Sequence, residues 1–115
     1  MFRARLVFGM VASVILLQTP AIADDFPSRP ITIVVPYAPG GATDQSVRLT
    51  SEVASKLLGQ PIVVENRPGG GGQIAASTVK NAAPDGYTLL LGDVSTLSIN
   101  PSAYSKLNYD PVADF

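Results

Sequence analysis

The 115-residue sequence contains no cysteine and no histidine. Without cysteine, the chain forms no disulfide bonds and must be stabilised by packing alone. The absence of both residue types excludes zinc, copper and haem sites of the usual kinds. A Ser-His-Asp catalytic triad cannot be formed either. The sequence therefore predicts no metal site and none of the chemistry that depends on these side chains.

The N-terminal segment 1–23 is typical of an export signal. Arg3 and Arg5 form a short positive region, positions 6–17 are uncharged, and Ala21-Ile22-Ala23 fits the small-x-small cleavage pattern. The alternative is a membrane anchor, but an apolar run of about 12 residues is short of the ~20 that a spanning helix needs. We predict a signal peptide over residues 1–23, cleaved after Ala23, and a mature chain over residues 24–115.

Positive charge is scarce in the predicted mature chain. Loss of Arg3 and Arg5 leaves six of the eight lysines and arginines against all nine aspartates and glutamates, a formal net charge of −3 instead of −1. No basic run or basic helix face is present to hold a phosphate backbone. We therefore expect no nucleic-acid partner.

Three short apolar runs alternate with two helical patterns. Strands are predicted at residues 30–35, 61–65 and 87–91, each rich in β-branched or leucine side chains. A helix is predicted from a cap at Thr43 or Asp44 through Leu58, and a shorter one over residues 74–82. Strands that alternate with helices predict an α/β fold with a parallel sheet, in the order strand, helix, strand, helix, strand.

Details of the elements can also be predicted. The first helix should end at Gly59 in a left-handed conformation. Its core face, read from helical spacing, consists of Val47, Thr50, Ala54, Leu57 and Leu58. Pro84-Asp85-Gly86 predicts a turn before the third strand.

Beyond Gly92 the pattern weakens. We expect a polar loop over residues 93–98, a helical turn at Asn100-Pro101 and a helix entrance at Asp110-Pro111. No further strand follows, so residues 24–115 are expected to be the front part of a larger structure.

Two glycine loops follow the first two predicted strands. The segments 34–41 and 63–70 match without a gap at two valines, a proline and two glycines. In an open parallel sheet, ligands bind beyond the carboxyl ends of the strands. The first N–H groups of each helix lack partners there, and glycine lets the main chain approach an anion closely. We predict one main-chain anion site with two walls, the alternative for either loop alone being a tight turn.

The second loop also fits a dinucleotide-binding pattern. Residues 70–75 satisfy G-x-G-x-x-A after a strand, and Asp93 lies where a ribose-binding acid would lie. A nucleotide-cofactor-binding enzyme domain is therefore one alternative, and a remnant without function is another. The export signal and the matching loop on the preceding strand argue against the nucleotide.

Taken together, these motifs resemble the periplasmic solute-binding proteins of tripartite tricarboxylate transporters, the Bug or TctC-like family. The motifs that carry the resemblance span the mature chain: FPSRPI at 26–31, PYAPGGATD at 36–44, ENRPGGGG at 65–72, APDGYTLL at 83–90, INP at 99–101 and YDPVADF at 109–115.

The resemblance implies a Venus-flytrap fold, in which two domains close on a small carboxylate. The chain matches the N-terminal part of the first domain, and the second domain is missing. The implied protein is not an enzyme, has no cofactor, resides in the periplasm and serves the membrane components of the transporter. A single lobe cannot enclose its ligand, so we expect weak or no binding by this chain alone.

The resemblance also implies which residues contact the ligand. Main-chain N–H groups of both loops, with ordered water, would hold its carboxylate, and the segment after the third strand would add polar contacts. Asp44 could instead only complement the helix dipole, and Arg67 could pair with Glu65 rather than with a ligand. The candidate residues are Tyr37, Ala38, Pro39, Gly40, Gly41, Ala42, Thr43, Asp44, Arg67, Gly69, Gly70, Gly71, Gly72, Gln73, Asp93, Ser95 and Thr96.

Overall fold

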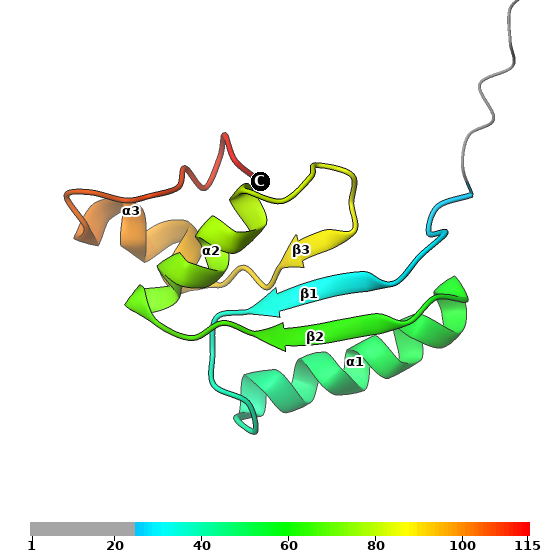
Figure 1. Cartoon of the computed structure of the whole chain (residues 1–115). Coiled ribbons are helices and arrows are strands. Elements are labelled where there is room, and N and C mark those ends of the chain that lie inside the picture. Colours follow the sequence, from blue (N-terminus) through cyan, green and yellow to red (C-terminus); the bar gives the residue numbers. More distant parts are fainter. Residues whose placement is uncertain (1–24) are drawn as a thin grey trace, which may run out of the picture.

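The computed structural model describes residues 25–115, which contain one three-stranded parallel sheet (Figure 1). Its strands are β1 (Ile31–Val35), β2 (Ile62–Asn66) and β3 (Thr88–Leu90), in the order β2-β1-β3. The predicted α/β fold with a parallel sheet is confirmed. The predicted signal peptide and its cleavage site lie outside the described residues.

Two helices connect the strands. Helix α1 (Ala42–Leu58) joins β1 to β2, and α2 (Gln73–Lys80), preceded by the 3₁₀ turn η1 (Gly70–Gly72), joins β2 to β3. The chain moves one way across the sheet after β1 and the other way after β2. Right-handed connections therefore place α1 and α2 on opposite faces of the sheet (Figure 1).

The core lies around the central strand. Ile31, Val34 and Val35 of β1 are buried, together with Ala75 and Ala76 of α2. The two alanines allow α2 to approach β1 and β3 closely, because they add little side chain between helix and sheet. Strands β2 and β3 form the sheet edges and are only partly covered.

Helix α1 differs from its predicted description at its start. Its N-cap is Gly41, without a side-chain cap, whereas Thr43 and Asp44 lie in its first turn. The predicted cap was wrong because the Asp44 carboxylate accepts a hydrogen bond from the Gly40 N–H before the helix. The predicted end is correct: Gly59 has φ 68°, and its N–H donates to the Ser55 carbonyl at 3.0 Å.

The predicted core face of α1 was also wrong in part. The buried residues of the helix are Asp44 and Ser51, whereas Leu57 is 83% exposed and Leu58 is 43% exposed. Helix α1 packs chiefly against β2, at one edge of the sheet. Part of its apolar surface therefore faces outward.

Beyond β3 the chain forms the π-helical turn η2 (Ser95–Ile99), followed by helix α3 (Asn100–Ala103). The predicted polar loop over residues 93–98 was wrong, because the Asp93 carboxylate accepts the Thr96 N–H at 2.8 Å and starts a helical turn. The turn at Asn100-Pro101 is confirmed. Asp110-Pro111 begins no helix, since the Asp110 carboxylate accepts the N–H groups of Val112 and Ala113 and closes a single turn.

Within residues 25–115, no helix combines the length and the apolar character needed to cross a membrane.

Candidate functional site

A small hollow lies where the chain leaves the carboxyl ends of the three strands. It has a volume of about 140 Å³. One loop contributes Pro36 and Tyr37 after β1, the glycine loop contributes residues 69, 71 and 72 after β2, and Ser95 and Thr96 follow β3. Three segments that are distant in the sequence therefore meet at one edge of the sheet, as expected for parallel strands.

The residues of the two loops that are equivalent in the structure are not those that the sequence match aligns. The match aligns Val34 with Val63, whereas in the sheet Val34 pairs with Glu65 and Val35 with Asn66. The ladder continues through Glu65 and Asn66 of β2, whereas Pro36 lacks an N–H and ends β1. Extended beyond the strands, this register makes Gly71 and Gly72 the structural counterparts of Gly40 and Gly41.

The hollow is electrostatically suited to an anion. Gly41 and Gly72 are the N-caps of α1 and α2, and neither helix has a side-chain cap. The first N–H groups of a helix have no intrahelical partner, and the helix dipole gives them partial positive charge. The residues that line the hollow are all uncharged. Two main-chain donors at this edge are already bonded to carboxylates, Gly40 to Asp44 and Thr96 to Asp93. The glycine loop after β2 is therefore the part of this edge from which donors to an anion are expected.

The second loop requires its glycines. Gly69, Gly70, Gly71 and Gly72 have φ values of 124°, 58°, 63° and 92°, a region that other residues rarely adopt. A Cβ atom on Gly72 would lie 2.4 Å from Cγ2 of Thr96, and one on Gly71 would lie 2.8 Å from Oη of Tyr104. The glycine run is thus set by backbone shape and close packing.

The buried Asp44 side chain supports the first loop through hydrogen bonds. Its side chain is 3% exposed, and its carboxylate accepts hydrogen bonds from the Gly40 N–H at 2.9 Å, Arg48 Nε at 3.0 Å and Asn66 Nδ2 at 2.9 Å. The hydrogen bond from Arg48, followed by that from Gly40, lowers the pKa of Asp44 from 3.8 to about 2. The carboxylate is fully engaged, so the structure places Asp44 as a support of the loop.

Asn100 and Tyr109 hold the second loop and η2. The Asn100 side-chain amide donates to the Gly71 carbonyl at 2.8 Å and to Tyr109 Oη at 3.1 Å. The Tyr109 hydroxyl donates in turn to the Thr96 carbonyl at 2.5 Å. Asn100 and Tyr109 are both 4% exposed. This buried network fixes two of the three segments that line the hollow.

Sequence reasoning missed these supporting residues. Asn66, Asn100 and Tyr109 reach the loops only through tertiary contacts, and no spacing rule connects them to a glycine loop. Arg48 is different, because it pairs with Asp44 four residues earlier in the same helix. The available signal was weak: Asn66 follows a predicted strand, and Asn100 precedes a proline.

The other candidate residues fall into three groups. Asp93 lies at the rim, where its carboxylate accepts a hydrogen bond from the Tyr37 hydroxyl. Arg67 pairs with the Glu65 carboxylate, its Nε at 2.7 Å, and both side chains are exposed. The rest do not line the hollow: Ala38, Pro39, Gly40, Gly41, Ala42, Thr43, Gly70 and Gln73.

The sequence matches a known protein family. The family described as "Tripartite tricarboxylate transporter family receptor", TctC, matches residues 46–115. Among curated relatives, a protein of the gbd 5' region of Cupriavidus necator is 47% identical over 98 residues, which are 85% of this chain and 29% of the relative. Protein BugT of Bordetella pertussis is 40% identical over 117 residues, 97% of this chain and 36% of the relative.

Solved structures resemble the fold. MatC from Rhodopseudomonas palustris with bound malate is 48% identical, with a TM-score of 0.74 over 78% of this chain and 31% of that one. The periplasmic binding protein BugD is 42% identical, with a TM-score of 0.73 over 78% and 30%. Rpa4515 of R. palustris with adipate is 41% identical, with a TM-score of 0.71 over 76% and 29%. The chain thus spans about a third of the length of the proteins it matches.

Proposed function

Because the chain belongs to the family of tripartite tricarboxylate transporter receptors, TctC, we propose that it supplies one wall of a periplasmic receptor site for a small carboxylate. The receptor would deliver this ligand to the membrane components of a tripartite tricarboxylate transporter. It would bind its ligand without chemical change, and no enzymatic activity is proposed.

One observation carries the proposal. The hollow of about 140 Å³ is lined by Gly72, the glycine at which α2 starts without a side-chain cap, and its lining residues carry no charge. Such a site offers main-chain N–H donors to an anion of modest size. Two related proteins, MatC with bound malate and Rpa4515 with adipate, favour a dicarboxylate.

The nucleotide alternative is weakened by the same geometry. Asp93, the candidate ribose-binding acid, is already bonded to the Tyr37 hydroxyl, the Thr96 N–H and the Thr96 hydroxyl. A pocket for a ligand of drug size or larger usually exceeds about 300 Å³, whereas this hollow has about 140 Å³. A dinucleotide would therefore require both more room and a free acid.

Amide chemical shifts of the whole chain can test the proposal. Titration with malate should move the amide signals of Gly71, Gly72, Ser95 and Thr96, with a dissociation constant of about 1 mM or weaker because the chain offers one wall only. NAD should leave these signals in place. Larger shifts with NAD than with malate, or malate shifts confined to other residues, would count against the proposal.

Two serine variants sharpen this test. Ser95 lines the hollow, whereas Ser98 lies in the same turn, is exposed and is not part of the lining. Ser95→Ala should weaken malate binding roughly fivefold through the loss of one hydrogen bond. Ser98→Ala should leave binding unchanged.

We also propose that residues 1–23 are a signal peptide and that residues 24–115 form part of the N-terminal lobe. N-terminal sequencing of exported protein should then begin at Asp24. Retention of Arg3 and Arg5 in the exported protein would contradict this.

A further inference from the structure

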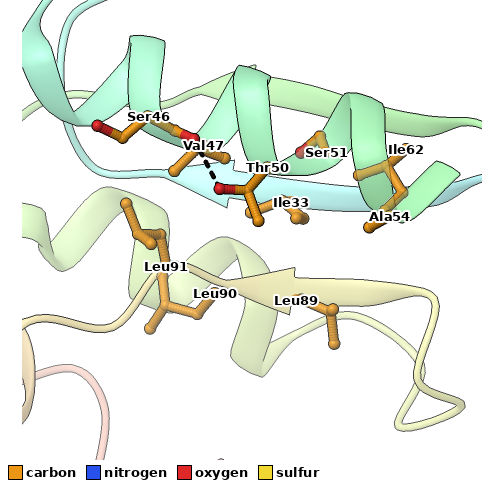
Figure 2. A pocket seen from close by; sticks show the side chains of 10 residues that line it. All are labelled: Ile33, Ser46, Val47, Thr50, Ser51, Ala54, Ile62, Leu89, Leu90 and Leu91. Atoms are coloured by element: carbon orange, nitrogen blue, oxygen red, sulfur yellow. Dashed lines mark hydrogen bonds between the residues drawn. The ribbon is translucent and has the colours of Figure 1, made fainter.

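A second and larger hollow lies between α1 and the sheet. It has a volume of about 320 Å³ and shares no lining residue with the hollow at the glycine loops. Figure 2 shows Val47, Thr50 and Ala54 of α1, and facing them Ile33 and Leu89 of the sheet and Leu91, which directly follows β3. No charged side chain lines it. We name this hollow the α1 groove.

The α1 groove exists because α1 covers only one edge of its face of the sheet. The helix packs chiefly on β2. Ile33 of β1 and Leu89 of β3 point to the same face, and Leu89 is 43% exposed. A parallel sheet is ordinarily covered by helices on both faces. On this face the part of the structure described, residues 25–115, leaves β3 without a helix.

An exposed apolar stripe on α1 adjoins the groove. Leu49, Val53 and Leu57 follow one another at every fourth position and are 68%, 59% and 83% exposed. They therefore form one stripe along the helix. Thr50, which lines the groove, lies one turn before Val53 and two turns before Leu57, so the stripe and the groove form one continuous surface.

We infer that the α1 groove binds an amphipathic helix, which belongs to the part of the receptor that this chain does not span. That part is large, since the chain covers only 31% of MatC while superposing on it with a TM-score of 0.74. A helix beside α1 and over β3 would cover Leu89, Leu91 and the stripe together. Helices pack side by side in this way at roughly 8–10 Å between axes.

One polar atom refines the description of this helix. Ser51 Oγ lines the groove and is buried, and it has no hydrogen-bond partner among the described residues. A buried hydroxyl without a partner is costly. The occupying helix should therefore be apolar on the face that packs, with one polar side chain that reaches Ser51. A free carboxylate is not expected here, because the groove offers it no cation.

Fragment complementation tests this inference independently of ligand binding. The whole chain is mixed with a MatC polypeptide that lacks the segment similar to this chain. Complex formation is then measured by size-exclusion chromatography with light scattering and by calorimetry. The matching segment of MatC itself serves as the positive control. A complex of one copy each is expected.

Variants on exposed positions locate the contact. Thr50→Arg and Leu57→Asp each place a charge in the proposed interface, and each should weaken the complex about tenfold or more. Glu52→Arg lies on the same helix outside the groove lining and should change the affinity little. Circular dichroism should be the same for all three, because the substituted residues are exposed.

Three results would overturn the inference. The first is an equally tight complex with Thr50→Arg and Leu57→Asp. The second is no complex under conditions in which the MatC segment forms one. The third is a homodimer of this chain that both variants disrupt and that the MatC polypeptide does not displace, which would assign the groove to a second copy of the chain.

Discussion

The two loops that border the small hollow have the same place in the fold but are held in different ways. The first loop is held by a charged network, in which the Asp44 carboxylate accepts hydrogen bonds from the Gly40 N–H and from the side chains of Arg48 and Asn66. The second is held by neutral hydrogen bonds from Asn100 and by glycines with positive φ. The first loop has one glycine with positive φ, Gly40 at 87°, against four in the second. Equivalent main-chain sites can thus depend mainly on charge in one loop and mainly on backbone shape in the other.

The largest expected effect is a difference in stability between alanine variants of the two N-cap glycines. Gly72→Ala should destabilise the chain by about 3 kcal/mol, because overpacking and left-handed backbone each add to the cost; its φ is 92° and its Cβ would lie 2.4 Å from Thr96 Cγ2. Gly41→Ala is the matched control. At Gly41 φ is −73° and the nearest atom to a Cβ is 3.7 Å away, so this change should be close to neutral. Urea unfolding followed by circular dichroism measures both, and equal losses would remove the contrast between the loops.

The second effect concerns pH and should appear in the first loop only. The folded-state pKa of Asp44 is lowered from 3.8 to about 2. A lowered pKa contributes stability above pH 3.8, and this contribution is lost as pH falls through 3.8 towards 2. The Gly40 amide signal should titrate with a midpoint near pH 2, and the Gly72 amide should not follow it.

Asp44→Asn checks the assignment of that titration. Loss of the charge should abolish the Gly40 titration and flatten the stability profile between about pH 4 and 2, with a smaller stability loss at neutral pH than for Gly72→Ala. Asp110 and Asp114 also have lowered pKa values, chiefly from backbone N–H groups that donate to their carboxylates. Their contribution should persist in the variant. A Gly40 titration that also persists would show that another group causes it.

The third effect tests the neutral support of the second loop. Tyr109→Phe removes the donor to the Thr96 carbonyl and one partner of Asn100, at a cost of about 1–2 kcal/mol. Tyr104→Phe is the control, since Tyr104 is 43% exposed. Its stability should change by less than about 0.5 kcal/mol. A pH-dependent loss in Tyr109→Phe would contradict the neutral character of this support.

The parts of this structure that depend on local pattern could be predicted from the sequence, and the tertiary supports could not. Alternating β-branched runs indicated the strands, and Gly59 indicated the end of α1, because each is determined by a few adjacent residues. The pairing of Val34 with Glu65 was missed, since β2 continues through Glu65 and Asn66 after its two valines, whereas β1 ends at Val35, before Pro36. Asn100 and Tyr109 act only after folding brings them behind Gly71 and Thr96.

The smallest expected effect concerns the charged residue nearest the second loop. Arg67 pairs with Glu65 at the surface, where both side chains are well exposed, 49% and 40%. Arg67→Gln should therefore cost less than about 1 kcal/mol of stability, because exposed pairs contribute little. Malate shifts at Gly71 and Gly72 should be retained, since main-chain donors carry the proposed binding. If Arg67→Gln instead abolished those shifts while Glu65→Gln, which removes the other half of the pair, kept them, Arg67 would be a direct ligand of the carboxylate. The second loop would then depend on charge for binding, although not for its shape.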